Sequence, residues 1–217
     1  MKTSKQYRLT ARELTHGKIF KLFLIGLVFG VILGALSFAG PIILGYVSFG
    51  MTLTYIAIIN EQEPLLDQVL LAGVKEQPVK ALILGIVQPL FISLWSLLFI
   101  IPGIIKSYSY ALSTYILIKE PTIESMDAIT KSRQLMNGYK WKLFALDLSY
   151  LGWYVLPLFT FGILSIWINE WHQNARILGW YVLSLFTFGI LTIWISAWHQ
   201  TARTLFFRDV YQVEKGK

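Results

Sequence analysis

Lys106 and Asp147 are the only charged side chains that stand well inside the long apolar segments of this sequence. An ionisable side chain within a bilayer costs about 3 kcal/mol on insertion scales, so each is a candidate functional residue. The alternative, which we favour, is that Lys106 reaches the outer membrane interface and Asp147 the inner one. We expect no buried pair between them, because they lie toward opposite faces of the membrane.

Two histidine–arginine pairs have the spacing of one helical turn. His172 and Arg176 are repeated as His199 and Arg203, and residues four apart share one face of a helix. Such a face could hold the phosphate or carboxylate of a lipid headgroup. Because a tryptophan precedes each histidine, we favour simple anchoring at the membrane interface.

Lys131 and Arg133 lie on the basic face of a polar segment. Basic residues on the cytoplasmic side orient a membrane protein, and they also attract anionic headgroups. We favour a solvated, orienting face and keep both residues as candidate headgroup ligands, since the two roles are compatible.

No constellation of catalytic residues occurs in the sequence. It contains no cysteine, no nucleophile elbow and no glycine-rich phosphate loop. The two histidines and Glu170 lack the spacing of an HExxH zinc site. We therefore expect no enzyme activity, no metal and no cofactor, since an intramembrane enzyme would need a dyad that is missing here.

Long uncharged helices must position the candidate residues. The stretch from Leu22 to Asn60 carries no charge and is about twice the ~20 residues that cross a bilayer as a helix. Hydrophobic residues make up 55% of the chain and charged residues 14%, against roughly 25% charged residues in soluble domains. We predict an all-α, polytopic transmembrane helical bundle in the plasma membrane.

The net charge of +7 is concentrated at the ends of the apolar segments. That distribution indicates orientation by the positive-inside rule rather than binding of nucleic acid. We therefore expect the basic segment 1–18 and the C-terminus in the cytoplasm.

About six spans are predicted within a single membrane domain, residues 1–217. Gly40-Pro41 and Pro102-Gly103 are expected to form tight outer turns. Residues 61–80 and 119–142 would be cytoplasmic amphipathic segments. The spans cover residues 19–38, 42–60, 81–101, 104–118, 143–168 and 177–198.

Residues 151–177 and 178–204 form a tandem repeat whose copies differ at six of 27 aligned positions. Twenty-seven helical residues are about 40 Å long, enough for one crossing and too few for two. The alternative turns the chain at Thr160 to Gly162 and at its copy, which places Arg176 in the cytoplasm. Its legs of about 13 residues are too short to span, so we favour six spans.

Gly26, Gly30 and Gly34 recur every four residues and therefore share one helical face. Small residues let two membrane helices approach closely. We favour packing within the chain, and a dimer seam is the alternative.

Three segments carry a resemblance to a known family: SLLFIIPGIIKSYSYALSTYILIKEP, SMDAITKSRQLMNGYKWKLFALDLSYLGW and the closing FFRDV. They resemble an uncharacterised bacterial membrane family, the domain of unknown function numbered nine-seven-five. The resemblance extends over nearly the whole chain and is most specific from Trp95 to Trp153. It implies a polytopic plasma-membrane protein and no catalytic or ligand residues. The doubled C-terminal unit departs from the family's pattern.

Two hypotheses about function remain open. The first is a non-catalytic protein that binds membrane lipids, anionic ones in particular, or a second copy or another membrane protein. Its docking surfaces would be the amphipathic segments 61–80 and 119–142, the latter with an apolar stripe of Ile123, Met126 and Ile129. The alternative is a small transporter or export component, supported by proline and glycine within apolar helices and by the two intramembrane charges.

Overall fold

The computed structural model describes residues 1–35, 40–63, 72–171 and 177–216, and in this part of the chain every regular element is a helix. The predicted all-α class is confirmed. The helices are α1 (Ser4–Thr15), α2 (Ile19–Ala35), α3 (Gly40–Ile59), α5 (Pro78–Leu98), α6 (Ile100–Tyr110), α7 (Ser113–Lys119), α8 (Ser125–Leu135), α9 (Lys140–Trp171) and α10 (Ile177–Lys215).

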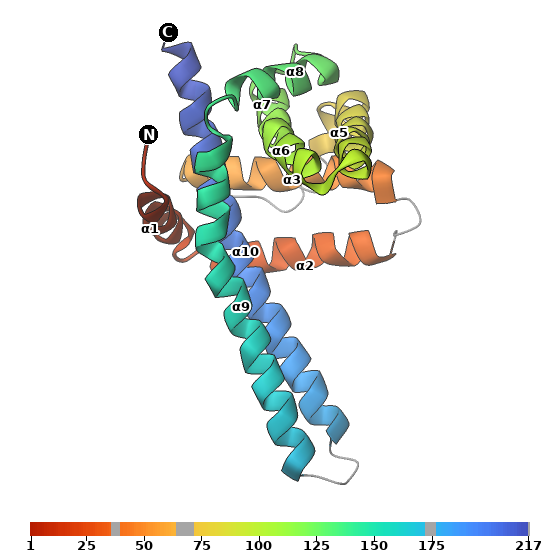
Figure 1. The fold of residues 1–217 in the computed structure, drawn as a ribbon, viewed down its shortest axis with the longest axis vertical. Helices are drawn as coiled ribbons and strands as arrows, with labels where there is room; N and C mark the ends of the chain where they lie inside the picture. Colours follow the sequence, from red (N-terminus) through yellow and green to blue (C-terminus); the bar gives the residue numbers. More distant parts are fainter. Residues whose placement is uncertain (36–39, 64–71, 172–176, 217) are drawn as a thin grey trace.

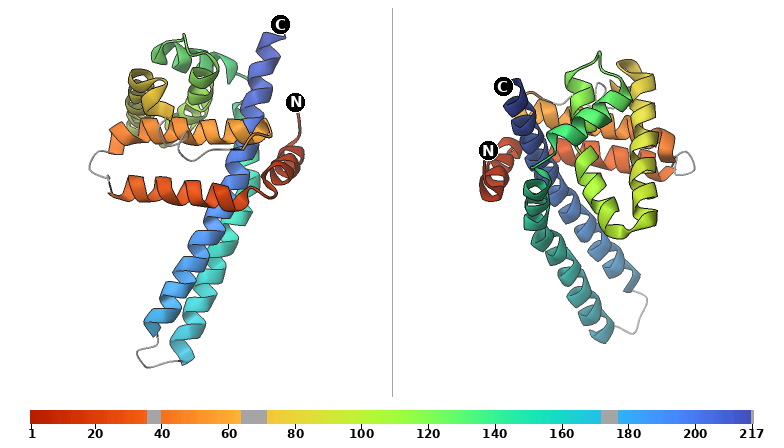
Figure 2. Two further views of the ribbon diagram at one scale, coloured as in Figure 1. Left: turned by 180° about the vertical axis from the view of Figure 1, so that it is seen from behind. Right: turned by 45° about the horizontal axis from the view of Figure 1, so that its top comes forward.

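The two longest helices, α9 and α10, form an antiparallel hairpin whose tip projects away from all the other helices (Figure 1). The α2–α3 hairpin runs across this pair rather than alongside it, as both further views also show (Figure 2). Helix α3 lies between α2 and the group α5 to α8, and α1 packs against α10. The α9–α10 hairpin therefore contacts α1, α2, α3, α6, α7 and α8, whereas α5 packs on α3 and α6.

Helix α1 starts at a capping box that the sequence specifies locally. The Thr3 hydroxyl accepts a hydrogen bond from the Gln6 backbone N–H, and the Thr3 N–H donates to Gln6 Oε1 at 2.8 Å. These two bonds satisfy donors that the first helical turn leaves without partners. The helix then buries Tyr7 and Ala11, and the Tyr7 ring packs edge-on against Phe206 of α10.

The connection between α5 and α6 falls earlier than predicted. Phe99 alone separates the two helices, with φ −157° and ψ 144°, and Pro102 and Gly103 lie in the first turn of α6. Proline fits there because the first N–H groups of a helix have no acceptor within it. The expected outer turn at Pro102-Gly103 is therefore wrong. Gly103 instead allows close packing, since a Cβ there would come within 2.9 Å of Ser96 Cα.

Other predicted boundaries differ in similar ways. Gly40 and Pro41 form the start of α3 rather than a preceding turn, and the predicted fourth span is divided at Ala111 and Leu112 into α6 and α7. Thr160 to Gly162 and their copy lie inside α9 and α10, so the alternative with turns at these positions is wrong. Asn137-Gly138 is a helix-stop signal in the sequence, and α8 ends just before it at Leu135, with Gly138 at φ +80°.

One helix in the described residues, Pro78–Leu97, is long and apolar enough to cross a membrane, and Ile19–Gly30 and Ile43–Ile59 are shorter apolar helices. Only 17% of the most apolar window of Pro78–Leu97 is buried. At its end the side chain of Leu97 is 86% exposed. These features suggest an association with a membrane, because water would disfavour so much open apolar surface.

The contact between α3 and α5 gives a first testable prediction. A Cβ at Gly45 would collide with the Ala81 carbonyl oxygen and lie 3.1 Å from Gly85 Cα. Since these are backbone atoms, G45A should destabilise the protein by about 1–3 kcal/mol, measured as thermal unfolding in detergent. G30A is the matched control, because nothing lies within 4 Å of a Cβ at Gly30. Equal stability of the two variants would contradict the packing of α3 on α5.

Candidate functional site

Three ionisable side chains meet where α9 lies against α10. His199 Nε2 is 2.8 Å from Asp147 Oδ1, and Arg203 Nε is 3.7 Å from the same oxygen. The side chains are largely shielded, with 17% of Asp147 and 13% of His199 exposed. An acid and two basic groups are thus gathered at the contact between two largely apolar helices.

Two tyrosines of α9 hold the imidazole of His199. The Tyr150 ring stacks on it with centroids 4.7 Å apart, and the Tyr154 hydroxyl lies 3.3 Å from His199 Nδ1. A neutral imidazole that donates from Nε2 to Asp147 accepts from Tyr154 at Nδ1, so both ring nitrogens are satisfied. Asp147, Tyr150 and Tyr154 are three and four residues apart, which places them on one face of α9.

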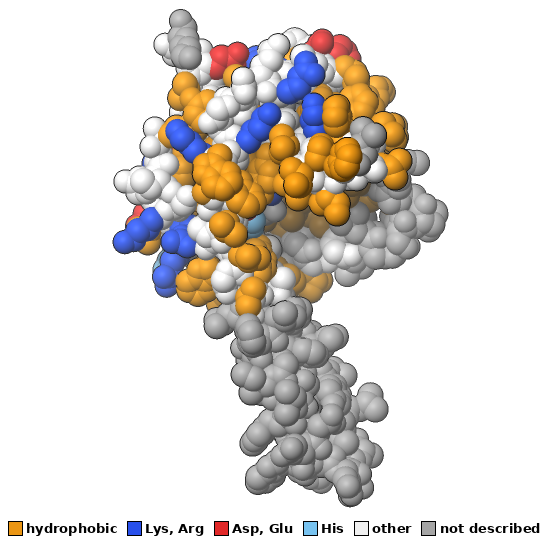
Figure 3. Space-filling model, in the orientation of Figure 1, with side chains coloured by type: hydrophobic (Ala, Val, Ile, Leu, Met, Phe, Trp, Pro, Cys, Tyr) orange, Lys and Arg blue, Asp and Glu red, His pale blue; other side chains and the backbone are white. Residues whose placement is uncertain are grey.

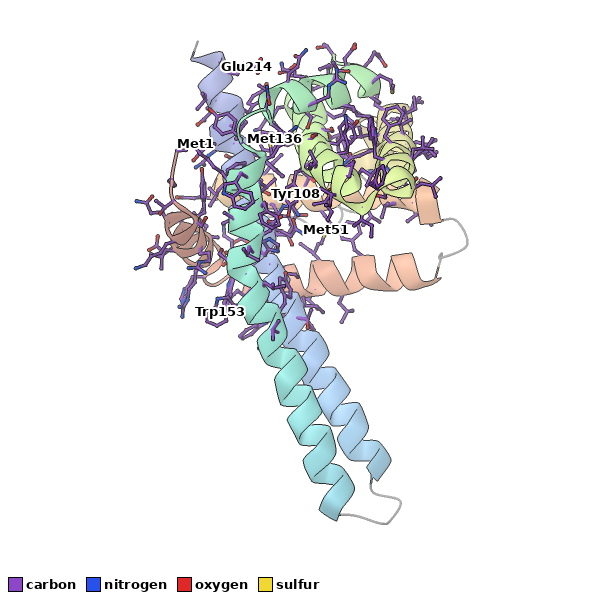
Figure 4. The ribbon with its side chains drawn as sticks, viewed as in Figure 1. Met1, Met51, Tyr108, Met136, Trp153 and Glu214 are labelled. Carbon is purple, nitrogen blue, oxygen red and sulfur yellow. The ribbon has the colours of Figure 1, made fainter. Side chains whose placement is uncertain are left out.

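A cavity of about 380 Å³ opens beside this cluster. Arg203 faces it and its Nε is buried without a hydrogen-bond partner in the described residues. Figure 4 shows Tyr108 where α6 approaches α9, at the same cavity. The lining residues are Thr52, Gln88, Ile92, Ser107, Tyr108, Ala111, Thr114, Tyr115, Asp147, Gln200, Arg203 and Phe207.

The chemistry of the lining is that of hydrogen bonding to a small polar molecule. It offers one carboxylate, one guanidinium, two side-chain amides and several hydroxyls. The carboxylate and the guanidinium balance in charge, and the amides and hydroxyls both donate and accept. Within the described ranges no group of three metal-ligating side chains is found.

The two intramembrane charges predicted from the sequence lie in different surroundings. Asp147 is in the cluster just described, whereas the Lys106 amino group lies 4.3 Å from the centre of the Trp95 ring. That position suits a cation–π contact. In the described part of the chain, no ion pair joins Lys106 to Asp147.

The predicted headgroup residues are dispersed. His199 and Arg203 point into the protein, and Lys131 pairs with Glu120 at 2.7 Å. Arg133 is exposed, and His172 and Arg176 lie outside the described residues.

Glu120 is held at the end of α7 by two donors. Lys131 pairs with its carboxylate, and the Tyr211 hydroxyl of α10 donates to it at 2.6 Å. The hydrogen bonds from Lys131 and Tyr211 hold the pKa of Glu120 below its usual range. Burial, and then the bonded Glu120, raise the pKa of Tyr211. Lys131 therefore joins α8 to α7 and α10 instead of facing free solvent.

Of the glycines that recur every four residues on α2, only Gly26 lies near another helix in the described residues. A Cβ at Gly26 would lie 3.6 Å from Ile193 of α10, and a Cβ at Gly30 would meet nothing within 4 Å. The surroundings of Gly34 lie outside the described residues. Both packing within the chain and a dimer seam stay predictions.

The apolar stripe of Ile123, Met126 and Ile129, which begins just before α8, is mostly an internal surface. Ile129 is 4% exposed and packs in the cluster that contains Tyr110 and Leu117, with Ile123 against it. Only Met126, which is 48% exposed, faces outward. The stripe is therefore engaged within the fold and is not a free docking face.

Sequence reasoning missed the tyrosines that hold His199 and the amides that line the cavity. The signal for the tyrosines was present, since Asp147, Tyr150 and Tyr154 form a polar stripe on an apolar helix. Gln88 gave no comparable signal, because only the packing of α5 brings it to the cavity.

The cluster predicts a stability effect. D147A would leave the Arg203 guanidinium without its carboxylate, so we expect a loss of about 3 kcal/mol by thermal unfolding in detergent. D127A removes an exposed carboxylate from α8 and should change stability by less than about 0.5 kcal/mol. A D147A protein as stable as D127A would show that the cluster does not hold the hairpin.

Comparison with curated proteins gives no match, and comparison with solved structures gives none. Residues 97–178, which run from the tip of the α5–α6 hairpin to the start of α10, match the sequence model of one family. That family is described as a protein of unknown function (DUF975), so the predicted resemblance is confirmed over residues 97–178, and its extension over nearly the whole chain stays a prediction.

Proposed function

We propose that this chain is a multi-pass membrane protein, with both termini in the cytoplasm, that binds a small polar solute in the cavity beside Asp147. The observation that carries the proposal is a cavity of about 380 Å³ with a polar lining, in a protein whose α5–α6 hairpin exposes large apolar side chains. Solute binding by such a protein serves transport or export, and the proposal includes no chemical step.

Membrane insertion is supported by the α5–α6 hairpin. A helix in the core of a soluble protein hides its apolar surface, whereas most of Pro78–Leu97 is open. At the hairpin tip Phe99, Ile100 and Ile101 are all exposed. Such a surface is stable in contact with lipid and unstable in contact with water.

The cytoplasmic side is inferred from the charges at the other end of the same hairpin. Lys80 donates hydrogen bonds to the carbonyl oxygens of Pro121 and Ile123, at 3.0 and 2.9 Å. Lys119 and Lys131 lie in the same region, at the end of α7 and in α8. Basic residues that gather at one end of an apolar hairpin favour the cytoplasmic face there.

Solute binding is supported by the free-energy cost of the charged side chains that line the cavity. Charged side chains are expensive in a membrane and mark substrate pathways. Arg203 has a buried donor with no protein acceptor in the described residues, and a bound polar molecule would supply one. The volume lies within the range of about 300–1,000 Å³ typical of small-molecule sites.

These observations favour the transporter hypothesis over the hypothesis of a docking protein. The apolar stripe near the start of α8, one of the docking surfaces expected of a partner-binding protein, is mostly engaged inside the fold. A transporter needs a polar interior, and the cavity offers one. The solute-binding alternative is therefore the stronger of the two.

The topology can be tested with single cysteines, because the chain has none of its own. M126C in α8 and V213C in α10 replace exposed side chains. Both should resist a membrane-impermeant maleimide in intact cells and react after permeabilisation, measured by gel shift. F99C at the tip of the α5–α6 hairpin is the control for the opposite face of the membrane. Its reaction with the maleimide should not depend on permeabilisation. Reaction of M126C or V213C in intact cells would contradict the proposed orientation.

Solute binding can be tested by profiling polar molecules released when the purified protein is denatured. The wild type should release a small polar compound in near-stoichiometric amount. Q88L removes a cavity amide without touching the Asp147 cluster, and it should lower the released amount about tenfold, since a site that binds through hydrogen bonds loses about 1.4 kcal/mol or more without one.

Q134L is the matched control, because Gln134 is exposed on α8. It should release as much compound as the wild type. Equal release from Q88L and wild type, or no polar compound from either, would overturn the assignment of this cavity as a solute site.

A further inference from the structure

We propose that the pocket between α1 and the α9–α10 hairpin is a second site, which binds the phosphate headgroup of an anionic lipid. It is separate from the solute cavity and shares no lining residue with it. The pocket has a volume of about 320 Å³ and is lined by Lys5, Arg8, Leu9, Arg12, Tyr150, Trp153 and Trp198.

One wall of the pocket is basic. Lys5, Arg8 and Arg12 lie three and four residues apart, so α1 presents all three on one face. None of them forms an ion pair in the described residues, and no carboxylate lines the pocket there. Figure 3 shows basic side chains gathered over α1 beside apolar ones.

The position of the basic wall is fixed by contacts with the hairpin. Arg8 Nη1 donates to the Ser149 carbonyl oxygen at 2.8 Å, and the Arg12 guanidinium lies 5.9 Å from the centre of the Trp198 ring. The Tyr7 hydroxyl, on the opposite face of α1, donates to Asp209 at 2.7 Å. Burial and the bonded carboxylate raise the pKa of Tyr7, so that anchor stays protonated and α1 is held in place.

The other wall is aromatic and apolar. Trp153 of α9 is 50% exposed, Tyr150 lies on the same helix, and Leu9 adds apolar surface from α1. Trp198 supplies an indole Nε1 that is buried and has no acceptor in the described residues. An oxyanion at the mouth of the pocket would accept from this donor and neutralise the cations.

The chemistry of the two walls indicates which class of ligand the pocket binds. A free phosphate would use only the basic wall and would leave Leu9 and Trp153 in contact with water. A molecule with a phosphate at one end and an acyl chain at the other covers both walls. Tryptophan and basic residues together are typical of the headgroup level of a bilayer. The ligand class is therefore an anionic phospholipid.

The test is a binding titration of the full-length protein in detergent. The probe is dihexanoyl-phosphatidylglycerol, with dihexanoyl-phosphatidylcholine as the zwitterionic comparison. K5Q/R12Q removes two exposed cations and keeps the Arg8 contact that supports the fold. Each cation near an anionic headgroup contributes roughly fivefold in affinity, so the double variant should bind phosphatidylglycerol about 25-fold more weakly.

K75Q/K119Q is the matched control, because it makes the same change in net charge at exposed positions away from α1. It should bind within about twofold of the wild type. Similar losses in both double variants would overturn the site, because net charge alone would then explain the binding. Equal affinity for the two lipids would overturn it as well.

W153A separates the lipid from a free anion. It should weaken binding of phosphatidylglycerol and leave the weak binding of glycerol 3-phosphate unchanged. Glycerol 3-phosphate that binds as tightly as the lipid would overturn the lipid assignment. Failure of the solute cavity in the Q88L experiment would leave these results unaffected, since Gln88 does not line this pocket.

Discussion

The pairing of Asp147 with His199 is the interaction on which the rest of the structure depends. A carboxylate on an apolar helix is costly unless a neighbouring helix compensates it, and 2.8 Å to His199 with Arg203 beside it provides that compensation. The contact fixes the register of α9 against α10. Because α10 also packs on α1, α2 and α3, this register sets where those helices lie.

Both candidate sites follow from that register. The cavity exists because Arg203 faces the side where α3, α5 and α6 contribute amides and hydroxyls. On the other side of the hairpin, Tyr150 and Trp198 come together with α1 and form the wall of the basic pocket. Tyr150 touches both arrangements, since it stacks on His199 and its hydroxyl donates to the Trp198 carbonyl at 3.3 Å. One hairpin thus separates a polar interior from a basic surface.

Local patterns in the sequence predicted the helices well, but they predicted poorly which helices pack against one another. The uncharged runs gave helices, Gly138 ended a polar helix, and His199 and Arg203 do share one face. The spacing of residues along one helix does not show which other helix packs against that face. The sequence therefore did not predict that His199 and Arg203 would meet Asp147 of α9. The turn at Phe99 was missed for a similar reason, because Pro-Gly suits the first turn of a helix as well as a loop.

The tandem repeat illustrates the same limit. In an antiparallel pair, a residue earlier in one helix meets a residue later in the other, so two identical copies face different partners. The partner of His199 is Asp147, which stands before the first copy begins, and the residue 27 positions after Asp147 is Asn174. The histidine and the arginine thus recur in both similar segments of the sequence, whereas the carboxylate does not. The Asp147 site belongs to the pairing of α9 with α10 and not to the repeated sequence, so a chain with a single copy would need to supply the histidine directly opposite Asp147 to build it.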